Sequence, residues 1–279
     1  MATPDITRDV RIALAEDVGS GDITARLIPG STLAEARVIS RESAIVCGGA
    51  WFDEVFRQLD PTLQVVWHCA DGDRVVPDQV LCIVRGAARS LLTGERSALN
   101  FLQTLSGTAT VTRRYVDALA GTQTKILDTR KTIPGLRAAQ KYAVLCGGGQ
   151  NHRMGLYDAV LIKENHIAAA GSIAHAVAAI RSLTRTGFKI EIEVENLAQL
   201  KDAINAGVDI ALLDNMDTQM VAEAVGVAAG RVLLEASGGI TLDNIYDYAK
   251  TGVDFISIGA ITKHLHAVDL SMRFTSDLV

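Results

Sequence analysis

The stretch KIEIEVENLAQLKDAINAGVDIALLDN, residues 189–215, decides the fold. Its two ends are short runs rich in Ile, Val and Leu, which are typical of buried strands. Residues 197–206 between them repeat apolar side chains at helical spacing, and Ala206-Gly207 resembles a helix C-cap. A strand, a helix and a second strand in this order predict a βαβ unit and a parallel sheet.

The same rhythm continues through the second half of the chain. Strands are predicted at residues 125–129, 159–165, 189–195, 210–215, 232–237 and 255–260. Helices are predicted at residues 174–183, 197–206, 219–227 and from Leu242 to Thr251. Because no dinucleotide-binding fingerprint is present, these elements favour a closed or nearly closed α/β barrel. A flavodoxin-like open sheet remains the alternative.

The first hundred residues have a different pattern, which predicts an α+β domain. Short strand-like runs flank a predicted helix at residues 51–59, and a long or broken helix is expected from about residue 95 to 119. Gly107 is a candidate break in that helix. We therefore predict an N-terminal domain at residues 1–107 and a barrel domain at 108–265.

Composition excludes several classes of function. The chain has 279 residues, a formal net charge of -5 and only 5% aromatic residues, which argues against a nucleic-acid-binding protein. It contains no apolar run long enough for a transmembrane helix and no secretory signal. The four cysteines have no zinc-site spacing. We expect a cytoplasmic protein with reduced thiols that binds neither nucleic acid nor membrane.

Basic side chains concentrate in one part of this acidic chain, between residues 130 and 163. They are Arg130, Lys131, Arg137, Lys141, His152, Arg153 and Lys163. Such a local excess of positive charge indicates a strongly anionic ligand. Arg137 and Lys141 lie on a predicted helix, where a solvated surface is the default interpretation.

Polar residues stand where the predicted strands end, which is where barrels of this class carry their sites. Glu191, Glu193 and Glu195 alternate along one strand and should share a face. Of these, Glu191 and Glu195 are interpreted as structural or solvated. Lys163 has a structural alternative as an ion-pair partner of Glu193, and Asp214 has one as a helix cap.

Glycine clusters follow the last two predicted strands. Ser237-Gly238-Gly239 precedes a helix expected to begin near Thr241, and Gly259-Ala260 follows the next strand. Glycine lets backbone N–H groups approach a phosphate, and barrels often bind phosphate at this position. The pair of clusters therefore predicts a phosphate site, with simple turns as the alternative.

At this level of detail the chain resembles a known family, the quinolinate phosphoribosyltransferases. Three consecutive motifs carry the resemblance, and others match on both sides of them. The motifs are TRKTIPGLR at 129–137, GGGQNHRMGL at 147–156, LIKENH at 161–166, EDVGSGDIT at 16–24, ERSALNFLQ at 95–103, EASGGI at 235–240 and SIGA at 257–260. The match covers nearly the whole chain.

The resemblance implies an incomplete, TIM-like α/β barrel of about seven strands beside an α+β N-terminal domain. The C-terminal segment, residues 266–279, would return to that domain. It also implies a homodimer whose site is shared between subunits. The reaction would join quinolinate to phosphoribosyl pyrophosphate with Mg²⁺, giving nicotinate mononucleotide, pyrophosphate and CO₂ in NAD biosynthesis.

The resemblance also assigns roles to residues. Arg130, His152 and Arg153 would hold quinolinate, Lys131 and Lys163 would add positive charge, and Arg96 would reach in from the partner subunit. Glu193 and Asp214 would lie near the ribose and Mg²⁺, with Lys163 at the reacting centre. The glycine clusters, namely Ser237, Gly238, Gly239, Gly259 and Ala260, would bind the 5′-phosphate. Lys263 and His264 are equal candidates for the role of the family's histidine.

Two alternatives stay open. A ModD-like paralogue would act on another anionic acceptor, although the set of Arg130, His152 and Arg153 argues against it. A non-catalytic phosphosugar-binding regulator belongs to a different class, and the presence of Lys163, Glu193 and Asp214 argues against that. Turnover of quinolinate with phosphoribosyl pyrophosphate and Mg²⁺ would distinguish all three.

Overall fold

The computed structural model describes residues 3–183 and 187–275, which divide into two compact units. The first contains the residues up to Arg113, residues 132–148 and the residues from Ile261 on, and the second contains residues 114–131 and 149–260. Helix α3 (Ala88–Ala118) begins in the first unit and ends in the second. The predicted domain limits stay a prediction, because each unit is built from separate stretches of the chain and no single residue divides the two.

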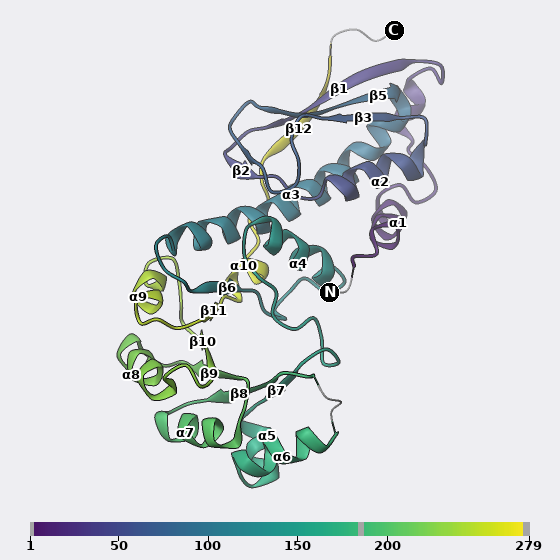
Figure 1. The fold of residues 1–279 in the computed structure, drawn as a ribbon. Coiled ribbons are helices and arrows are strands. Elements are labelled where there is room, and N and C mark those ends of the chain that lie inside the picture. The colour runs from purple at the N-terminus through teal and green to yellow at the C-terminus, as the bar shows by residue number, and fades with distance from the viewer. Residues whose placement is uncertain (1–2, 184–186, 276–279) are drawn as a thin grey trace. The chain divides into compact units, whose positions relative to one another are not determined.

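The first unit is an antiparallel sheet with helices on one face (Figure 1). Its main sheet has the strand order β12-β1-β5-β3, and β2 pairs with β4 in a small second sheet. The elements are α1 (Ile6–Asp17), η1 (Thr24–Leu27), β1 (Leu33–Ser40), β2 (Ala44–Ile45), α2 (Gly49–Leu59), β3 (Gln64–Trp67), β4 (Arg74–Val75), β5 (Val80–Ala87), α4 (Arg137–Cys146) and β12 (Leu270–Phe274).

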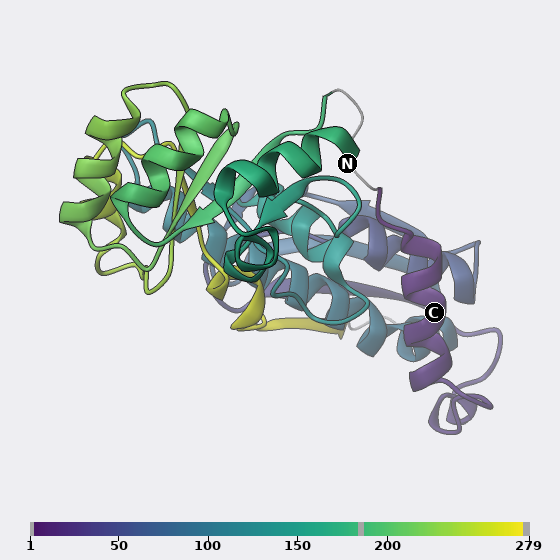
Figure 2. The same cartoon turned by 90° about the horizontal axis from the view of Figure 1, so that it is seen from below.

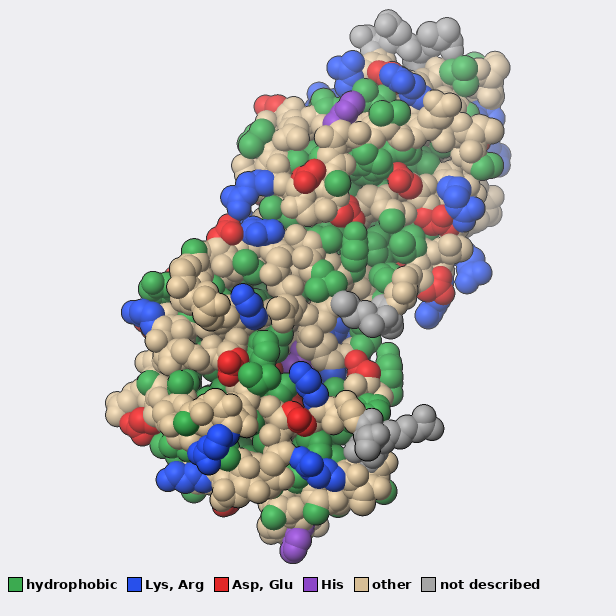
Figure 3. Space-filling model, in the orientation of Figure 1, with side chains coloured by type: hydrophobic (Ala, Val, Ile, Leu, Met, Phe, Trp, Pro, Cys, Tyr) green, Lys and Arg blue, Asp and Glu red, His purple; other side chains and the backbone are tan. Residues whose placement is uncertain are grey.

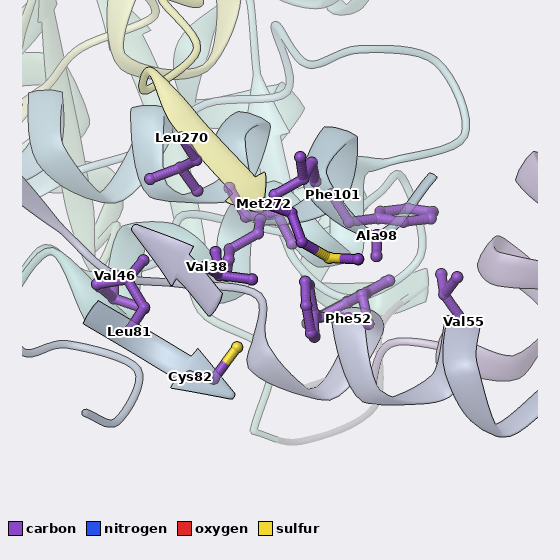
Figure 4. Packing of buried hydrophobic residues seen from close by; sticks show 14 of the residues in the cluster. Val38, Val46, Phe52, Val55, Leu81, Cys82, Ala98, Phe101, Leu270 and Met272 are labelled. Atoms are coloured by element: carbon purple, nitrogen blue, oxygen red, sulfur yellow. The ribbon is translucent and has the colours of Figure 1, made fainter. Parts of the chain in front are cut away.

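Alternating side chains of β1 create the core of this unit, because every second residue is buried. Val38 of β1, Phe52 of α2 and Met272 of β12 belong to the same cluster of buried side chains (Figure 4). Burying a side chain of this size contributes roughly 1.5–3 kcal/mol. Strand β12 pairs with β1, from Ala36–Phe274 to Ser40–Leu270, so the first and last strands of the described chain are neighbours in one sheet. Residues 276–279 of the predicted returning segment lie outside the described residues.

Helix α3 runs through Gly107 without a break, so of the two predicted alternatives the single long helix is confirmed. The glycine serves close packing instead. A Cβ atom at Gly107 would collide with the backbone carbonyl oxygen of His266, in the segment that leads to β12. The absent side chain therefore allows that segment to lie directly on the helix.

The second unit contains the predicted alternation of strands and helices, and all six predicted strands are present. Its elements are β6 (Lys125–Leu127), β7 (Val160–Ile162), α5 (Glu164–Ala170), α6 (Ile173–Leu183), β8 (Ile190–Val194), α7 (Leu197–Ala206), β9 (Ile210–Asp214), α8 (Thr218–Ala228), β10 (Leu233–Ser237), α9 (Ile245–Lys250) and β11 (Phe255–Ser257). The short helix α10 (Ala260–Lys263) leads back to the first unit.

These six strands form one parallel sheet in the order β6-β11-β10-β9-β8-β7. From β7 to β11 each strand lies beside its successor, so every crossover proceeds in the same direction and leaves its helix on one side. The helices after these strands, coloured green, lie along that side (Figure 2). This order differs from a doubly wound sheet, which reverses direction.

The first strand, β6, lies beside the last, β11, as a barrel requires. Leu127 of β6 also forms an isolated parallel bridge with Gln150. Among the described residues the sheet has six strands rather than about seven, with β6 and β7 as its outer members. Closure into a barrel stays a prediction.

Two helix starts differ from the expectations. Helix α5 begins at Glu164, inside the predicted strand 159–165, and the His166 ring accepts a hydrogen bond from the Lys163 backbone N–H. This local bond provides a partner for the backbone N–H of Lys163 at the start of the helix, and the apolar pattern that predicts the strand gives no sign of it. Helix α9 begins at Ile245 instead of near Thr241, because Asn244 accepts a hydrogen bond from the Thr241 N–H and holds a turn there.

Charged residues of both signs are interspersed on the face shown in Figure 3, without a continuous basic patch. Over the ranges that the structure describes, no helix has the length and apolar character needed to span a membrane.

Candidate active site

A cavity of about 210 Å³ lies within the second unit, at the carboxyl ends of its strands. Parallel strands end on the same edge of a sheet, so residues far apart in the sequence meet there. The lining residues are Thr129, Arg130, Lys131, His152, Arg153, Leu161, Lys163, Glu193, Leu212, Asp214, Glu235, Ser237 and Ser257. The cavity therefore brings together seven of the residues predicted to bind substrate, together with Ser237 of the predicted phosphate loop.

Arginine side chains define the basic side of the cavity. Arg130 follows β6, and Arg153 lies in the segment that connects the Gln150 bridge to β7. Burial lowers the pKa of the Arg153 guanidinium, and the neighbouring positive charge of Arg130 lowers it further. Glu191 and Asp158 partly offset this effect. Two guanidinium groups that repel each other in a half-buried cavity favour binding of an anion.

His152 is held by hydrogen bonds on both sides of its ring. Its Nε2 lies 2.8 Å from Glu191 Oε2, and its Nδ1 accepts a hydrogen bond of 2.8 Å from the Arg153 backbone N–H. With Nδ1 as acceptor, the ring proton lies on Nε2, which donates to Glu191. The buried Asp128 carboxylate accepts from the His152 backbone N–H at 2.9 Å and from Asn151 Nδ2 at 2.6 Å.

Beneath His152 lie two buried carboxyl groups, those of Glu191 and Glu235. Their residues are only 4% and 1% exposed, and Glu235 Oε2 lies 3.7 Å from His152 Nε2. Burial raises the pKa of Glu235 to about 8, with repulsion from Glu191 adding to the rise and His152 opposing it. At neutral pH Glu235 is therefore protonated, and the pair carries one negative charge.

The acidic side of the cavity is formed by the ends of two neighbouring strands, β8 and β9. Lys163 Nζ donates to Glu193 Oε2 at 2.6 Å, so the ion pair considered as a structural alternative is present. Asp214 Oδ2 accepts from Asn215 Nδ2 at 2.8 Å. Asp214 does not cap the next helix, because the side chain of Asp217 accepts from Met220 N there. Both carboxylates line the cavity.

Glycines after β10 and β11 permit close packing at the same edge. Gly238 has a φ of 101°, and a Cβ atom there would collide with the Asn215 side chain. A Cβ atom at Gly259 would come within 2.8 Å of Lys131 Cδ. Backbone conformation and packing therefore require glycine at 238 whether or not a phosphate binds there, whereas a side chain at 259 would only displace the flexible Lys131 side chain.

Five other predicted or undecided residues belong to the first unit. Arg96 is exposed on α3, and Lys263 and His264 are exposed at the end of α10 and just after it. Arg137 Nε donates to Thr132 Oγ1 at 3.1 Å. Lys141 is only 1% exposed, so the default interpretation of a solvated helix surface is wrong for this residue.

Sequence reasoning assigned no role to Glu235 and Asp128, and it treated Glu191 as structural or solvated. A signal was present in each case, because each carboxylate interrupts or ends an apolar run that predicts a buried strand. A carboxylate in such a place needs a partner or a proton. The identity of the partner depends on which strands are neighbours, and that information is not local.

Replacing Glu235 with Gln should flatten the pH dependence of stability. A carboxyl whose pKa rises from 4.5 to about 8 on folding contributes its full stability below pH 4.5 and loses it as the pH rises through 8. Wild-type protein should therefore lose more unfolding free energy than Glu235→Gln between pH 5 and 9. Urea unfolding at pH 5, 7 and 9 measures this, with Glu195→Gln as an exposed control on the same edge. Equal losses in wild type and Glu235→Gln would refute the assignment.

Two family models together match most of the chain. The model described as quinolinate phosphoribosyl transferase, N-terminal domain, matches residues 22–106, and that of the C-terminal domain matches residues 108–273. Among curated proteins, the probable nicotinate-nucleotide pyrophosphorylase (carboxylating) of Bacillus subtilis is 44% identical over 260 residues, covering 93% of this chain and 90% of that protein.

Other relatives agree over the same length. The nicotinate-nucleotide pyrophosphorylase (carboxylating) of Mycobacterium leprae is 42% identical over 279 residues, covering 96% of this chain and 97% of the relative. The solved structure of the nicotinate-nucleotide pyrophosphorylase from Francisella tularensis has a TM-score of 0.96 at 50% identity, with 98% of each chain covered. The motifs, the fold and these matches agree, and the chain belongs to the quinolinate phosphoribosyltransferase family.

Proposed function

We propose that the protein transfers a phosphoribosyl group from phosphoribosyl pyrophosphate to quinolinate in the de novo synthesis of NAD. The products would be nicotinate mononucleotide, pyrophosphate and CO₂. Family membership supports this activity. The observation that carries it is the cavity itself, in which two arginines face the anion site while two carboxylates line the edge formed by β8 and β9.

Quinolinate carries two adjacent carboxylates, and the basic side of the cavity suits them. Arg130 and Arg153 would bind the carboxylates through their planar guanidinium groups, which match carboxylate geometry. Lys131 would add charge from the same loop. His152 would position the arginine that follows it, since its ring accepts the Arg153 backbone N–H.

The sugar donor would occupy the acidic and glycine-rich side. Ser237 with Gly238, Gly239, Gly259 and Ala260 would receive the 5′-phosphate, because Ser237 and Ser257 line the cavity and the two glycine clusters follow β10 and β11 at the same end of the sheet. Glu193 and Asp214 offer the hard oxygen donors that Mg²⁺ prefers. Two carboxylates are enough when the substrate's pyrophosphate supplies further oxygens, so the residues present fit the ion. When bound, Mg²⁺ would neutralise charge on the departing pyrophosphate.

The residues then act chiefly by position and charge. As the pyrophosphate leaves, C1 of the ribose becomes positively charged, and Glu193 and Asp214 would stabilise it. Lys163 keeps Glu193 in place through their 2.6 Å contact. The quinolinate ring nitrogen attacks C1 as the bond from C1 to the pyrophosphate oxygen breaks. The resulting pyridinium stabilises the carbanion that remains when the 2-carboxylate departs as CO₂, and this carbon then takes up a proton from water. Holding both reactants in a fixed orientation supplies much of the rate enhancement.

Incubation with quinolinate, phosphoribosyl pyrophosphate and Mg²⁺ tests the proposal directly. We expect release of CO₂ and formation of nicotinate mononucleotide. Turnover of another pyridine acid without turnover of quinolinate would indicate a paralogue with a different acceptor. Binding of both substrates without products would indicate a regulator.

Replacing Arg130 with Ala should weaken use of quinolinate strongly. Two hydrogen bonds between charged groups contribute about 3 kcal/mol or more, which corresponds to a loss of about 100-fold or more in kcat/KM. Arg130→Lys should retain charge but lose the fork geometry, and its loss should be intermediate. Steady-state kinetics measures the effect, with Lys201→Ala on the exposed face of α7 as control. Near-normal kinetics in a folded Arg130→Ala protein would remove Arg130 from the site.

Replacing Asp214 with Asn should act on the other substrate. The KM for phosphoribosyl pyrophosphate and the Mg²⁺ concentration for half-maximal rate should both rise by about tenfold or more, since a hard anionic ligand is lost. Quinolinate binding alone, measured by calorimetry, should change little. Glu195→Gln provides a matched acidic control. Unaltered Mg²⁺ dependence would separate Asp214 from the ion.

We also propose that the enzyme is a cytoplasmic homodimer whose sites are shared between subunits. Arg96 supports this, because it belongs to the first unit and is exposed on α3 within the 95–103 motif. In the proposed dimer the exposed Arg96 of one subunit would enter the cavity of the other subunit and complete its dicarboxylate site. The four cysteines are free, which fits a reducing compartment.

Mixing two inactive variants tests the shared site. Arg96→Ala and Arg130→Ala lesions fall in the same site of a hybrid dimer and leave its other site intact. Co-refolding equal amounts should therefore restore about a quarter of wild-type activity, because half of the dimers are hybrids. No recovery from a mixture that forms hybrids, as native mass spectrometry can show, would place both residues of each site in one subunit.

A further inference from the structure

A pair of cysteines lies apart from the catalytic cavity, in the first unit. The Sγ atoms of Cys47 and Cys146 and a carboxylate oxygen of Asp71 all lie within 4.8 Å of one another. Cys47 is buried just before α2, and Cys146 is half-buried as the last residue of α4. Neither is among the residues that line the cavity. Two thiols this close can react with each other, and the transferase reaction uses neither of them.

The two thiols have opposite tendencies to ionise. Burial raises the pKa of Cys47, and its position beside Cys146 raises it further. The hydrogen bond from the Cys47 thiol lowers the pKa of Cys146, while burial and the negative charge of Asp71 oppose this effect. Cys146 is therefore the better nucleophile, and Cys47 is the buried thiol that contacts it.

Asp71 is fixed by other partners and makes a poor metal ligand. Its Oδ1 accepts hydrogen bonds of 3.1 Å from the backbone N–H groups of both Gly48 and Gly49. Its Oδ2 accepts one of 2.9 Å from the Tyr142 hydroxyl. These three bonds already occupy most of the lone-pair positions of the carboxylate, which leaves little capacity for a cation. The carboxylate instead anchors the turn that carries Cys47 beside the helix end that carries Cys146.

We propose that Cys146 and Cys47 form a site of reversible oxidation, at which a peroxide converts the two thiols into a disulfide. The Cys146 thiolate attacks a peroxide oxygen, so that an S–O bond forms, the O–O bond breaks and water leaves after protonation. The Cys47 sulfur then attacks the sulfenic sulfur, so that the S–S bond forms, the S–O bond breaks and a second water leaves. The two thiols lose two electrons and the peroxide gains them. A dithiol reverses the change by exchange.

The other two cysteines provide internal controls. Burial raises the pKa of Cys82, and burial also raises the pKa of Cys69 to about 11. The Cys69 thiol donates to the Leu81 carbonyl oxygen at 3.7 Å. Both should remain protonated and react slowly. At neutral pH we expect Cys146 to be alkylated at least about tenfold faster than Cys69 or Cys82.

The experiment uses the full chain, purified under reducing conditions and then treated with hydrogen peroxide. After alkylation and digestion without reductant, mass spectrometry should find the peptides of Cys47 and Cys146 linked, with two hydrogens lost. Dithiothreitol should restore both thiols. Cys146→Ser should abolish the link, and Cys47→Ser should leave a sulfenic acid on Cys146 that dimedone traps. Cys82→Ser should behave as wild type.

Three results would overturn the proposal. The first is oxidation of Cys69 or Cys82 at the rate of Cys146, and the second is over-oxidation of Cys146 in the wild type without a link to Cys47. The third is a pair of thiols that alkylate only after a chelator is added, which would indicate a bound metal. If serine at the buried position 47 disturbs folding, Cys47→Ala replaces it, and circular dichroism checks that this variant is folded.

Discussion

The hydrogen bond between His152 Nε2 and Glu191 Oε2 governs the charge beneath the catalytic cavity. Because Nε2 donates to Glu191, Nδ1 is left to accept the Arg153 backbone N–H, and the direction of this short chain of bonds is fixed. Glu191 also offsets the burial and repulsion that disfavour the charged Arg153. One buried carboxylate thus sets the tautomer of a histidine and supports the charge of the neighbouring arginine.

This arrangement depends on the order of the parallel strands. Glu191 is on β8 and Glu235 on β10, and β9 pairs with both strands. His152 belongs to the segment just after the Gln150 bridge with β6. The backbone N–H of His152 is tied to Asp128, directly after β6. The fold therefore brings Asp128 after β6, His152 after the bridge, Glu191 of β8 and Glu235 of β10 into one cluster, although each segment contributes only one or two polar residues.

The sequence predicts the strands well and the polar network poorly. All six strands of the second unit follow from short runs rich in Ile, Val and Leu, because a strand buried on both faces has an apolar local sequence. The start of α5 at Glu164 was missed, since it rests on a hydrogen bond between the Lys163 N–H and the His166 ring. The burial of Lys141 is not predicted, because the helical spacing of apolar residues around it does not show which face of the helix another segment covers.

The proton on Glu235 has a consequence for the ligand. Four basic residues line the cavity, namely Arg130, Lys131, Arg153 and Lys163, and Glu193 and Asp214 line its acidic side. Glu235 also lines the cavity, but it is protonated at neutral pH and adds no negative charge to these two. An ionised Glu235 would place a further negative charge against the bound anion. Desolvation of this buried carboxyl therefore helps to keep the cavity suited to anionic substrates.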